Sequence, residues 1–543
     1  MTYPAPMSSG AEAGPLNLEM ATLRSSVKIE PMIDRWHAWT HLLGPAQQAM
    51  NLAYRYLPAL ESFVASPSVH IAATHNPEMY GGPFVDLSID SLGEVSAYLS
   101  DIKERRAEAL RFAEEYRQFD RRLLSVAQGY SLNEYKLELP DTLKGRVELV
   151  YDLNKHPKIK ILEEMFAEDD MGLRESEGVL LHETPDPDRP FFLSTPKLYD
   201  AEGLFIGAPL GSAGVMRLCE ARSRPVDLVE LSEQLKVPLG ALAPYFTSES
   251  ANRTAEKYDG PGMRIRYFGH ASILIETKNS AILVDPTFAS ERSSTGEHLS
   301  FDDFPAEFDA VLISHGHQDH MSAEALMLLR HRTKKIIIPR NNAGELADPS
   351  LRIALERLGF TSIVETAPLQ RLSVGDASIT TLPFSGEHCD LDVHAKQCFL
   401  LEAAGIKVGM FVDSDAIDID VYRRLAHRLQ GMEILFVGME CNGAPLSWLY
   451  GPLTSSGVTK REDNSRRLSG ANCGQASALV DLLKPRQAYV YAMGQECWMR
   501  PLMGLNYKPD SIQLLESMRF VERCTAGGIT SERLFGAKEL VIE

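Results

Sequence analysis

The chain has 543 residues, of which 44% are hydrophobic and 24% charged, and its formal net charge is −19. This length is too great for one hydrophobic core and predicts two or more domains. The acidic charge argues against general nucleic-acid binding, because phosphate contacts need clustered Lys and Arg. The sequence contains no apolar run of about eighteen residues, the length that a membrane-spanning helix needs.

The seven cysteines are widely spaced and include no C-x-x-C pair. They predict neither a disulfide framework nor a thiolate metal site, and they favour a reducing compartment, which we take to be the cytoplasm. Residues 1–25 lack the basic start and the continuous apolar stretch of a secretory signal. We expect them to form a disordered leader.

Residues 26–250 predict a mixed α/β domain in which no chemical motif stands out. Within it, residues 90–124 carry apolar side chains at helical spacing. Ser91 and Glu94 have the spacing of a capping box at the start of that helix. Residues 189–207 read as turns and short strands, and residues 224–238 return to a helical pattern.

The polar segment "TSESANRTAEKYDGPG" (247–262) has the composition of a linker. After it come short runs rich in Val, Ile and Phe, such as "MRIRYFGHASILIET", "DAVLISHGH" and "IKVGMFVDSD", some of them separated by helical patterns. Strands that first follow one another and later alternate with helices predict two sheets with helices outside. The second domain therefore spans residues 256–543, and we expect it to fold and bind metal alone.

The densest cluster of chemically active residues is "VLISHGHQDHMS", which directly follows an apolar run. Residues two apart in an extended segment project to the same side, so His315 and His317 can hold one cation together. The chain then turns toward the next helix, and this turn lets Asp319 and His320 face a second metal position near the first. One loop thus predicts two adjacent metals with two ligands each, in preference to scattered surface histidines.

This loop, with "YFGHAS" and "ILVDPTF" before it and "MFVDSDA" after it, resembles the metallo-β-lactamase superfamily over residues 263–500. The resemblance implies an αββα sandwich with a two-metal site at the sheet edges. It implies that Asp413 bridges the metals, with Asp415 as the alternative. It also implies that His270 and Asp285 support the site from outside the ligand set, although packing explains them equally well.

The dizinc hydrolases of that superfamily have two further histidines, one before the bridging aspartate and one after a late strand. After Asp413 the only histidine is His427, inside a basic helical run that favours a solvated position. The late strand ends instead in Gln495 and Glu496. The last expected histidine is therefore missing.

At the earlier position Glu387 directly precedes His388. Adjacent side chains on an extended segment diverge, so we expect only one of them to be a ligand. A histidine there favours zinc and hydrolysis. A glutamate gives an oxygen-rich set that suits iron better. In that case the six metal ligands are His315, His317, Asp319, His320, Glu387 and Asp413.

Glu387 after "FSG", the missing late histidine, and the segments "PMIDRWHAWTHLLGPAQQAMNLAYR" and "NPEMYGGPFVDL" together resemble the diiron β-hydroxylases of antibiotic biosynthesis over residues 30–543. The resemblance implies an O2-dependent monooxygenase with two iron ions, in which Glu387 and Asp413 support the oxygen chemistry. Its substrate would be an amino acid held as a thioester on a nonribosomal peptide synthetase carrier domain and hydroxylated at the β-carbon. An external electron donor, a homodimer, and an N-terminal domain for dimerisation and carrier docking are implied too.

Two alternative functions remain at this point, a dinuclear zinc hydrolase of lactonase or phosphodiesterase type and a non-catalytic metal-binding protein.

The basic residues in 103–122 have two interpretations. The first is a solvated helix face, and the second is a docking face for an acidic carrier; the residues concerned are Arg105, Arg106, Arg117, Arg121 and Arg122. Four aromatic residues are candidates to line the substrate site or to pack in the core, namely Trp448, Tyr450, Trp498 and Tyr507.

Overall fold

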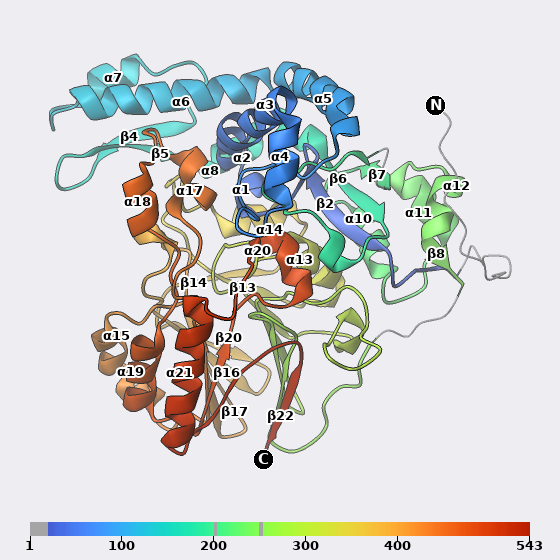
Figure 1. The fold of residues 1–543 in the computed structure, drawn as a ribbon, viewed down its shortest axis with the longest axis vertical. Coiled ribbons are helices and arrows are strands. Elements are labelled where there is room, and N and C mark those ends of the chain that lie inside the picture. Colours follow the sequence, from blue (N-terminus) through green and yellow to red (C-terminus); the bar gives the residue numbers. More distant parts are fainter. Residues whose placement is uncertain (1–19, 200–202, 249–253) are drawn as a thin grey trace.

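The computed structural model describes residues 20–199, 203–248 and 254–543 (Figure 1). Most of the expected leader lies outside these residues. Its end does not match the expectation, because Thr22–Leu23 form strand β1, which pairs with β8 (Phe246–Thr247) and is buried. None of the helices in the described ranges is both long and apolar enough to cross a membrane.

The N-terminal part is built on a four-stranded sheet in the order β3-β2-β6-β7. Its strands are β2 (Lys28–Ile33), β3 (Trp36–His37), β6 (Glu177–His182) and β7 (Leu204–Gly207). The helices that matter for the site are α1 (Thr40–Leu43), α2 (Pro45–Asn51), the π-helix η1 (Leu52–Tyr56), α3 (Leu57–Ala65), α5 (Leu92–Arg105) and α6 (Ala107–Val126). The helical pattern expected at 224–238 is confirmed by α11 (Leu228–Leu235).

The long helix expected at 90–124 differs from the prediction in two details. Ser91 precedes α5 but its side chain makes no capping hydrogen bond, because Ile89–Ser91 already form a helical turn. The helix also breaks at Arg106, which separates α5 from α6. Arg106 is buried and its Nε lies 3.1 Å from both carboxylate oxygens of Asp34, so it belongs to the interior and not to a basic surface.

The C-terminal part contains two seven-stranded mixed sheets. The first sheet has the order β14-β13-β12-β11-β10-β9-β22 and consists of β9 (Met263–Tyr267), β10 (Ile273–Glu276), β11 (Ala281–Val284), β12 (Ala310–Leu312), β13 (Ile336–Pro339), β14 (Ile363–Thr366) and β22 (Lys538–Ile542). The second runs β15 to β21 in sequence order and consists of β15 (Arg371–Val374), β16 (Ala377–Leu382), β17 (Cys398–Ala403), β18 (Ile406–Met410), β19 (Ile434–Gly438), β20 (Gln487–Tyr491) and β21 (Thr530–Arg533).

The two sheets pack face to face, as predicted. Alternation along β11 shows how: Ile282 and Val284 join the core between the sheets, while Leu283 points to the opposite face. Helices α19 (Cys473–Leu483) and α21 (Ile512–Ala526) cover the outer face of the second sheet, where they share a third apolar cluster. The result is the αββα sandwich that the sequence pattern and the resemblance predicted.

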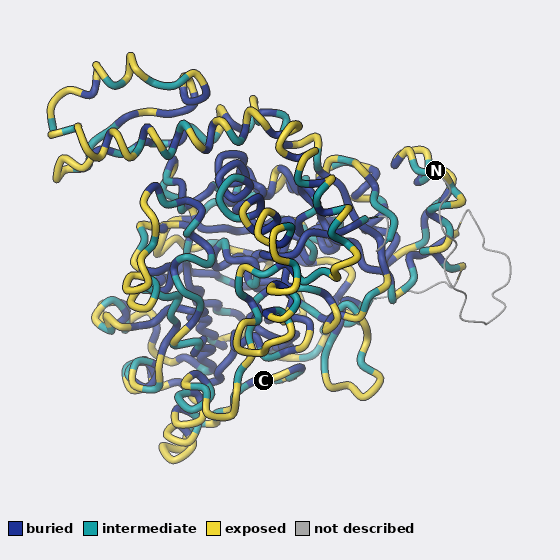
Figure 2. Tube along the Cα trace, turned by 45° about the horizontal axis from the view of Figure 1, so that its top comes forward, coloured by how far each residue is buried: buried dark blue, intermediate teal, exposed yellow. Residues whose placement is uncertain are grey.

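The N-terminal part covers the outer face of the first sheet. One continuous buried cluster joins residues of both parts, including Ile29, Leu42, Leu283 and Val311. Helices α13 (Ala323–Leu329) and α14 (Leu351–Arg357) lie between, in contact with β2 and α1 respectively. Figure 2 shows that the interior of the molecule is mostly buried. A shared core argues against the expectation that residues 256–543 fold alone.

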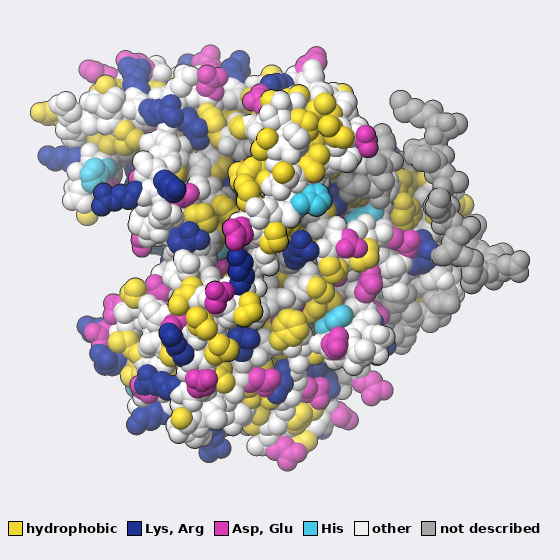
Figure 3. Space-filling view, viewed as in Figure 1, with side chains coloured by type: hydrophobic (Ala, Val, Ile, Leu, Met, Phe, Trp, Pro, Cys, Tyr) yellow, Lys and Arg dark blue, Asp and Glu magenta, His cyan; other side chains and the backbone are white. Residues whose placement is uncertain are grey.

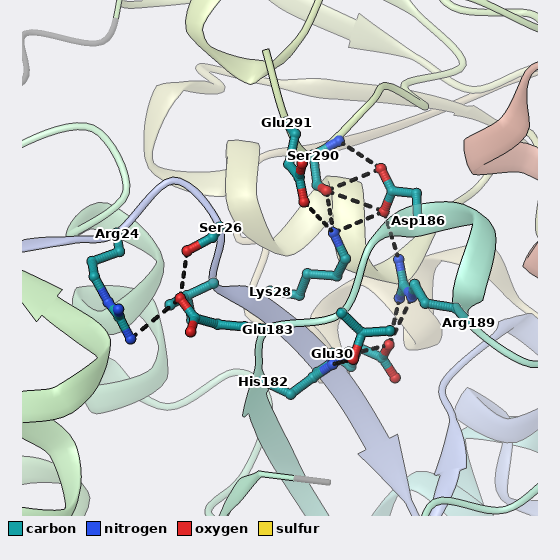
Figure 4. Close-up of polar contacts among 12 residues, drawn as sticks. Arg24, Ser26, Lys28, Glu30, His182, Glu183, Asp186, Arg189, Ser290 and Glu291 are labelled. Atoms are coloured by element: carbon teal, nitrogen blue, oxygen red, sulfur yellow. Dashed lines mark hydrogen bonds and ion pairs between the residues drawn. The ribbon is translucent and has the colours of Figure 1, made fainter. Parts of the chain in front are cut away.

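A buried ion network reinforces this contact (Figure 4). Arg189 donates from Nε to Glu30 at 2.8 Å and places Nη2 2.6 Å from Glu324, a residue of α13. Lys28 lies 3.0 Å from Asp186. Charges removed from water are tolerated only when they are paired, so these residues fix the N-terminal sheet against the C-terminal part.

Candidate metal centre

Four chain segments bring polar side chains to one edge of the sandwich. They follow β12, β16, β18 and β19, and each begins where its strand ends. Because β18 and β19 are parallel neighbours, the residues after them emerge at the same edge. The segment after β12 is the H-x-H-x-D-H loop, which ends where Ser322 accepts a hydrogen bond from Ala325 N and starts α13.

The first group of donors contains His315, His317 and Glu387. His315 Nε2 lies 3.0 Å from His317 Nδ1, which in turn lies 3.0 Å from Glu387 Oε1. The outward nitrogens are held in place, His315 Nδ1 by Ser314 at 2.9 Å and His317 Nε2 by Tyr450 Oη at 3.0 Å. Such outer contacts fix which ring nitrogen faces a metal.

The second group contains Asp319, His320 and Asp413. His320 Nε2 lies 3.1 Å from Asp413 Oδ2 and 3.4 Å from Asp319 Oδ2. Asp285 contacts His320 Nδ1 at 3.0 Å and accepts from Ser314, which agrees with the supporting role expected for it. The same structure puts donor atoms of His315, His320 and Asp413 within 4.8 Å of one another. Asp413 thus lies within reach of His320 in its own group and of His315 in the first group.

His270 lies closer to the second group than expected. Its Nε2 is 3.0 Å from Asp319 Oδ2, and His270, Asp319 and His320 can together surround one ion. Glu496 accepts from His270 N at 3.0 Å and from Tyr267 Oη at 2.6 Å, so it holds this turn and does not approach the metals. His270 is therefore either a further ligand or a direct support of Asp319.

Two other residues considered from the sequence lie apart from the donors. Asp415 accepts from Ser385 Oγ at 3.1 Å and Ile417 N at 3.0 Å, which makes it a turn cap. His427 is exposed on α16 (Ala426–Leu429). Neither belongs to a metal-sized group among the described residues.

The segment that carries Glu387 is not extended, contrary to the premise of the sequence argument. Residues 387–390 have φ between 52° and 57°, a left-handed conformation that costs energy for non-glycine residues. In this turn the neighbouring side chains converge, and His388 touches the Glu387 carboxylate and stacks on His317 with ring centroids 4.5 Å apart. Both Glu387 and His388 therefore reach the first group.

Neighbouring carboxylates raise the pKa of His317 and of His320 despite their burial, whereas burial has the larger effect on two other imidazoles near the donors. Burial lowers the pKa of His388 to about 4 and that of His41 to about 3, so both rings are neutral at neutral pH. His320 Nε2 and Asp413 Oδ1 are buried and make no hydrogen bond within the described residues. A metal ion would satisfy both atoms, and the mixture of imidazole and carboxylate donors fits a pair of irons.

A carboxylate that the sequence argument missed also faces this centre. Glu440 follows β19 and lines the same cavity as Asp319 and Asp413. Burial, reinforced by Asp413, raises its pKa well above the ordinary value. The feature that indicates Glu440 is the parallel pairing of β18 with β19, because this pairing places "VGME", which ends in Glu440, beside "FVDSD", which contains Asp413.

The donors open into a small space that we call the metal cavity. Its wall is formed on one side by His317, Asp319, Glu387, Asp413 and Glu440, and on the other by the apolar Leu193, Trp448, Leu502 and Met503. Of the four aromatic residues considered from the sequence, Trp448 lines this cavity and Tyr450 bonds His317. Trp498 packs in a separate apolar cluster.

The N-terminal part closes the other side of the metal loop. Thr40 Oγ1 donates to Gly316 O at 2.5 Å, and a Cβ at Gly316 would lie 2.9 Å from Leu351 and 3.4 Å from Thr40. A glycine at this position leaves room for Leu351 of α14 and Thr40 of α1, which both pack against the loop.

The fold and this centre define a metallo-β-lactamase-fold enzyme with two adjacent metal positions. A model of the β-lactamase superfamily domain matches residues 264–409, and a model of the diiron non-heme β-hydroxylase N-terminal domain matches residues 22–249. The 4-amino-L-phenylalanyl peptidyl-carrier-protein 3-hydroxylase of Streptomyces venezuelae is 32% identical over 94% of this chain and 98% of its own. The chain belongs to the diiron non-heme β-hydroxylase family.

Solved structures agree with this assignment. The crystal structure of a diiron β-hydroxylase from Streptomyces venezuelae superposes with a TM-score of 0.89 at 31% identity, covering 96% of this chain and 100% of that one.

The sequence likeness to hydrolases is much shorter. A metal-dependent hydrolase of Opitutus terrae is 35% identical, but over only 16% of this chain and 35% of its own. The predicted fold, enzyme class and iron cofactor are confirmed, and the family assignment replaces the zinc hydrolase alternative.

Proposed function

We propose that this enzyme hydroxylates the β-carbon of an amino acid held as a thioester on the carrier domain of a nonribosomal peptide synthetase, in the synthesis of a natural product. The observation that carries the proposal is the identity over nearly the full length with an enzyme named for hydroxylating a carrier-bound aminoacyl group. The N-terminal domain is included in that match, so the likeness extends beyond the metal-binding half.

The proposed ligands are His315, His317 and Glu387 for one iron and Asp319 and His320 for the other, with Asp413 between them. When bound, the irons would supply the reduction of O2 and the oxidising power that an unactivated C–H bond requires. The protein's part is to hold these buried donors at one side of the metal cavity and to leave an apolar wall for the substrate. We propose a boundary between the two domains near residue 255.

Hydroxylation by this route converts R–H, O2, two electrons and two protons into R–OH and water. The two electrons must come from an external donor, which we propose to be a separate redox protein. All seven cysteines are free, which suits a reducing cytoplasm. A homodimer is proposed from the resemblance and is tested by the mass of the enzyme in solution.

The decisive experiment loads a carrier domain with an amino acid and incubates it with reduced enzyme under ¹⁸O2. We expect mass spectrometry to show one ¹⁸O atom in the aminoacyl group while the thioester stays intact. Release of the amino acid, with oxygen taken from water, would instead establish a hydrolase. A panel of aminoacyl groups then identifies the side chain accepted.

A further inference from the structure

A second, larger cavity lies between the two domains, and we call it the outer cavity. Its volume is about 660 Å³, against about 60 Å³ for the metal cavity. That size lies within the range of about 300–1,000 Å³ typical of small-molecule sites. One wall comes from η1, α3 and α6 of the N-terminal domain, and the other from residues 445–463 of the catalytic domain.

The two cavities are neighbours that share part of their lining. Leu193 and Trp448 line both of them, and Trp448 is only partly buried. Arg55, a partly buried residue of the N-terminal domain, donates from Nη2 to Trp448 O and from Nε to Asn51 Oδ1 at 2.9 Å. Residues of both domains thus fix the position of the passage that leads to the metal donors.

The outer cavity carries unbalanced positive charge. Arg117 and Arg121 lie one turn apart on α6 and both line it. The acidic residue in its lining is Asp463, whose carboxylate is already occupied by Ser447 N at 2.8 Å and Ser447 Oγ at 2.6 Å. On the surface near α6, at the upper left of Figure 3, Lys and Arg side chains are visible together with Asp and Glu side chains.

Arg117 has a donor that nothing in the described chain uses. Its Nη2 donates to Pro452 O at 2.9 Å and its guanidinium lies 3.2 Å from the centre of the Tyr54 ring, yet its Nε is buried without a hydrogen-bond partner. Arg121 donates from Nε to Ser455 O, and its side chain is exposed. An unpartnered buried N–H beside a second guanidinium is suited to an anionic oxygen.

We propose that the outer cavity binds the phosphopantetheine arm of the carrier, with Arg117 and Arg121 holding its phosphate at the rim. This proposal rests on the function proposed above, which requires a carrier-bound thioester. Such an arm has a charged phosphate at one end, amide groups along its length and the thioester at the other. Those parts match the arginine rim, the mixed polar and apolar walls and the passage beside Trp448 into the metal cavity.

The first test uses the arm without the carrier, so that it does not depend on turnover. Binding of 4′-phosphopantetheine and of pantetheine, which lacks the phosphate, is measured by calorimetry on the iron-loaded enzyme. We expect the phosphorylated ligand to bind about tenfold more tightly or better, because charge-assisted hydrogen bonds are the stronger ones. The double variant Arg117→Met, Arg121→Met should bind the two ligands equally.

Arg122→Met is the matched control. Arg122 follows Arg121 on the same helix but pairs with Glu138 and does not line the cavity. It should keep the wild-type preference. Equal affinity of wild-type enzyme for the two ligands, or an equal loss in Arg122→Met, would overturn the proposal.

A second variant fills the cavity without touching an arginine. Gly457 lines it, and a Cβ at Gly457 meets no atom within 4 Å, so Gly457→Trp should fold and place the indole in the arm's path. Gly240 is equally open but lies in α12 (Leu239–Leu242), outside this lining, and Gly240→Trp is its control. We expect at least a tenfold weaker binding of phosphopantetheine for Gly457→Trp alone, with iron content unchanged in both. Wild-type binding by Gly457→Trp would refute the assignment.

With a loaded carrier, the arginine double variant should raise KM about tenfold or more and leave kcat within about twofold, since the metal cavity is untouched. If no carrier-bound amino acid is hydroxylated by the wild-type enzyme, the proposed function fails. The comparison of phosphopantetheine with pantetheine still decides the subsite in that event.

Discussion

The buried ion network offers the sharpest test of how the two domains are joined. Arg189→Met keeps a side chain of similar length but loses the cation–π contact to Phe192, whose ring centre lies 4.7 Å from the Arg189 guanidinium. The substitution also removes the main cationic partner of two carboxylates, those of Glu30 and Glu324. The side chain of Glu30 is 0% exposed, so water cannot replace the lost partner.

The magnitude follows from the contacts that remain to Glu30. His182 stays 2.8 Å from Oε1, while Lys197 and His37 lie 3.8 and 3.9 Å from Oε2. Removing one partner of a buried pair typically costs about 3–5 kcal/mol. With three weaker neighbours left, we expect the lower end, about 3 kcal/mol, which is roughly two powers of ten in the folding equilibrium constant.

The assay is denaturant unfolding, followed by circular dichroism and by tryptophan fluorescence. Lys103→Met is the control, because Lys103 and Glu61 form an exposed pair with side chains 47% and 51% accessible. That pair is worth less than about 1 kcal/mol. A second change, Glu30→Gln, should recover part of the loss caused by Arg189→Met. If Arg189→Met costs no more than the control, the network does not join the domains as argued.

Further predictions concern the metals and the shared core. Glu387→His should shift the bound metal from iron toward zinc and abolish hydroxylation, whereas His388→Ala should keep both irons; elemental analysis and the ¹⁸O2 assay decide, and the reverse pattern would make His388 the ligand. His315→Ala should empty at least one iron position, while the exposed His427→Ala should leave the iron content unchanged, and loss of iron in the latter would refute the ligand set. Residues 256–543 alone should aggregate on expression, because their outer sheet face is part of a core shared with the N-terminal domain. A monomeric, iron-loaded fragment would show that this face tolerates water.

The loop that binds the metals could be predicted because its geometry is local. In H-x-H-x-D-H, spacing alone tells which side chains share a side, and the structure places all four residues in the two donor groups. Asp413 and Glu387 are different, since each depends on strands far away in sequence. They were reached through the family resemblance, and their positions agree with it. Glu440 carried no such resemblance and was missed.

The errors have a common physical source in tertiary contacts. The left-handed turn at 387–390 is strained, and strain of that kind is held by surrounding structure and not by residue preference. Arg106 looked like a solvated helix residue because its partner, Asp34, lies 72 positions away. The break between α5 and α6 is located at that same residue.

The arrangement also explains why an oxygenase of this fold carries a large N-terminal domain. The metal loop lies at a sheet edge, where it would otherwise face water. Here α1 packs on Gly316, Leu193 forms part of the apolar wall, and Arg55 holds Trp448 beside the passage. Hydrolysis needs water at the metals, but an oxidant strong enough to break a C–H bond must be kept from side reactions. We therefore propose that the N-terminal domain acts on the chemistry as well as on carrier binding, because the residues that line the proposed path for the thioester also cover the metal donors.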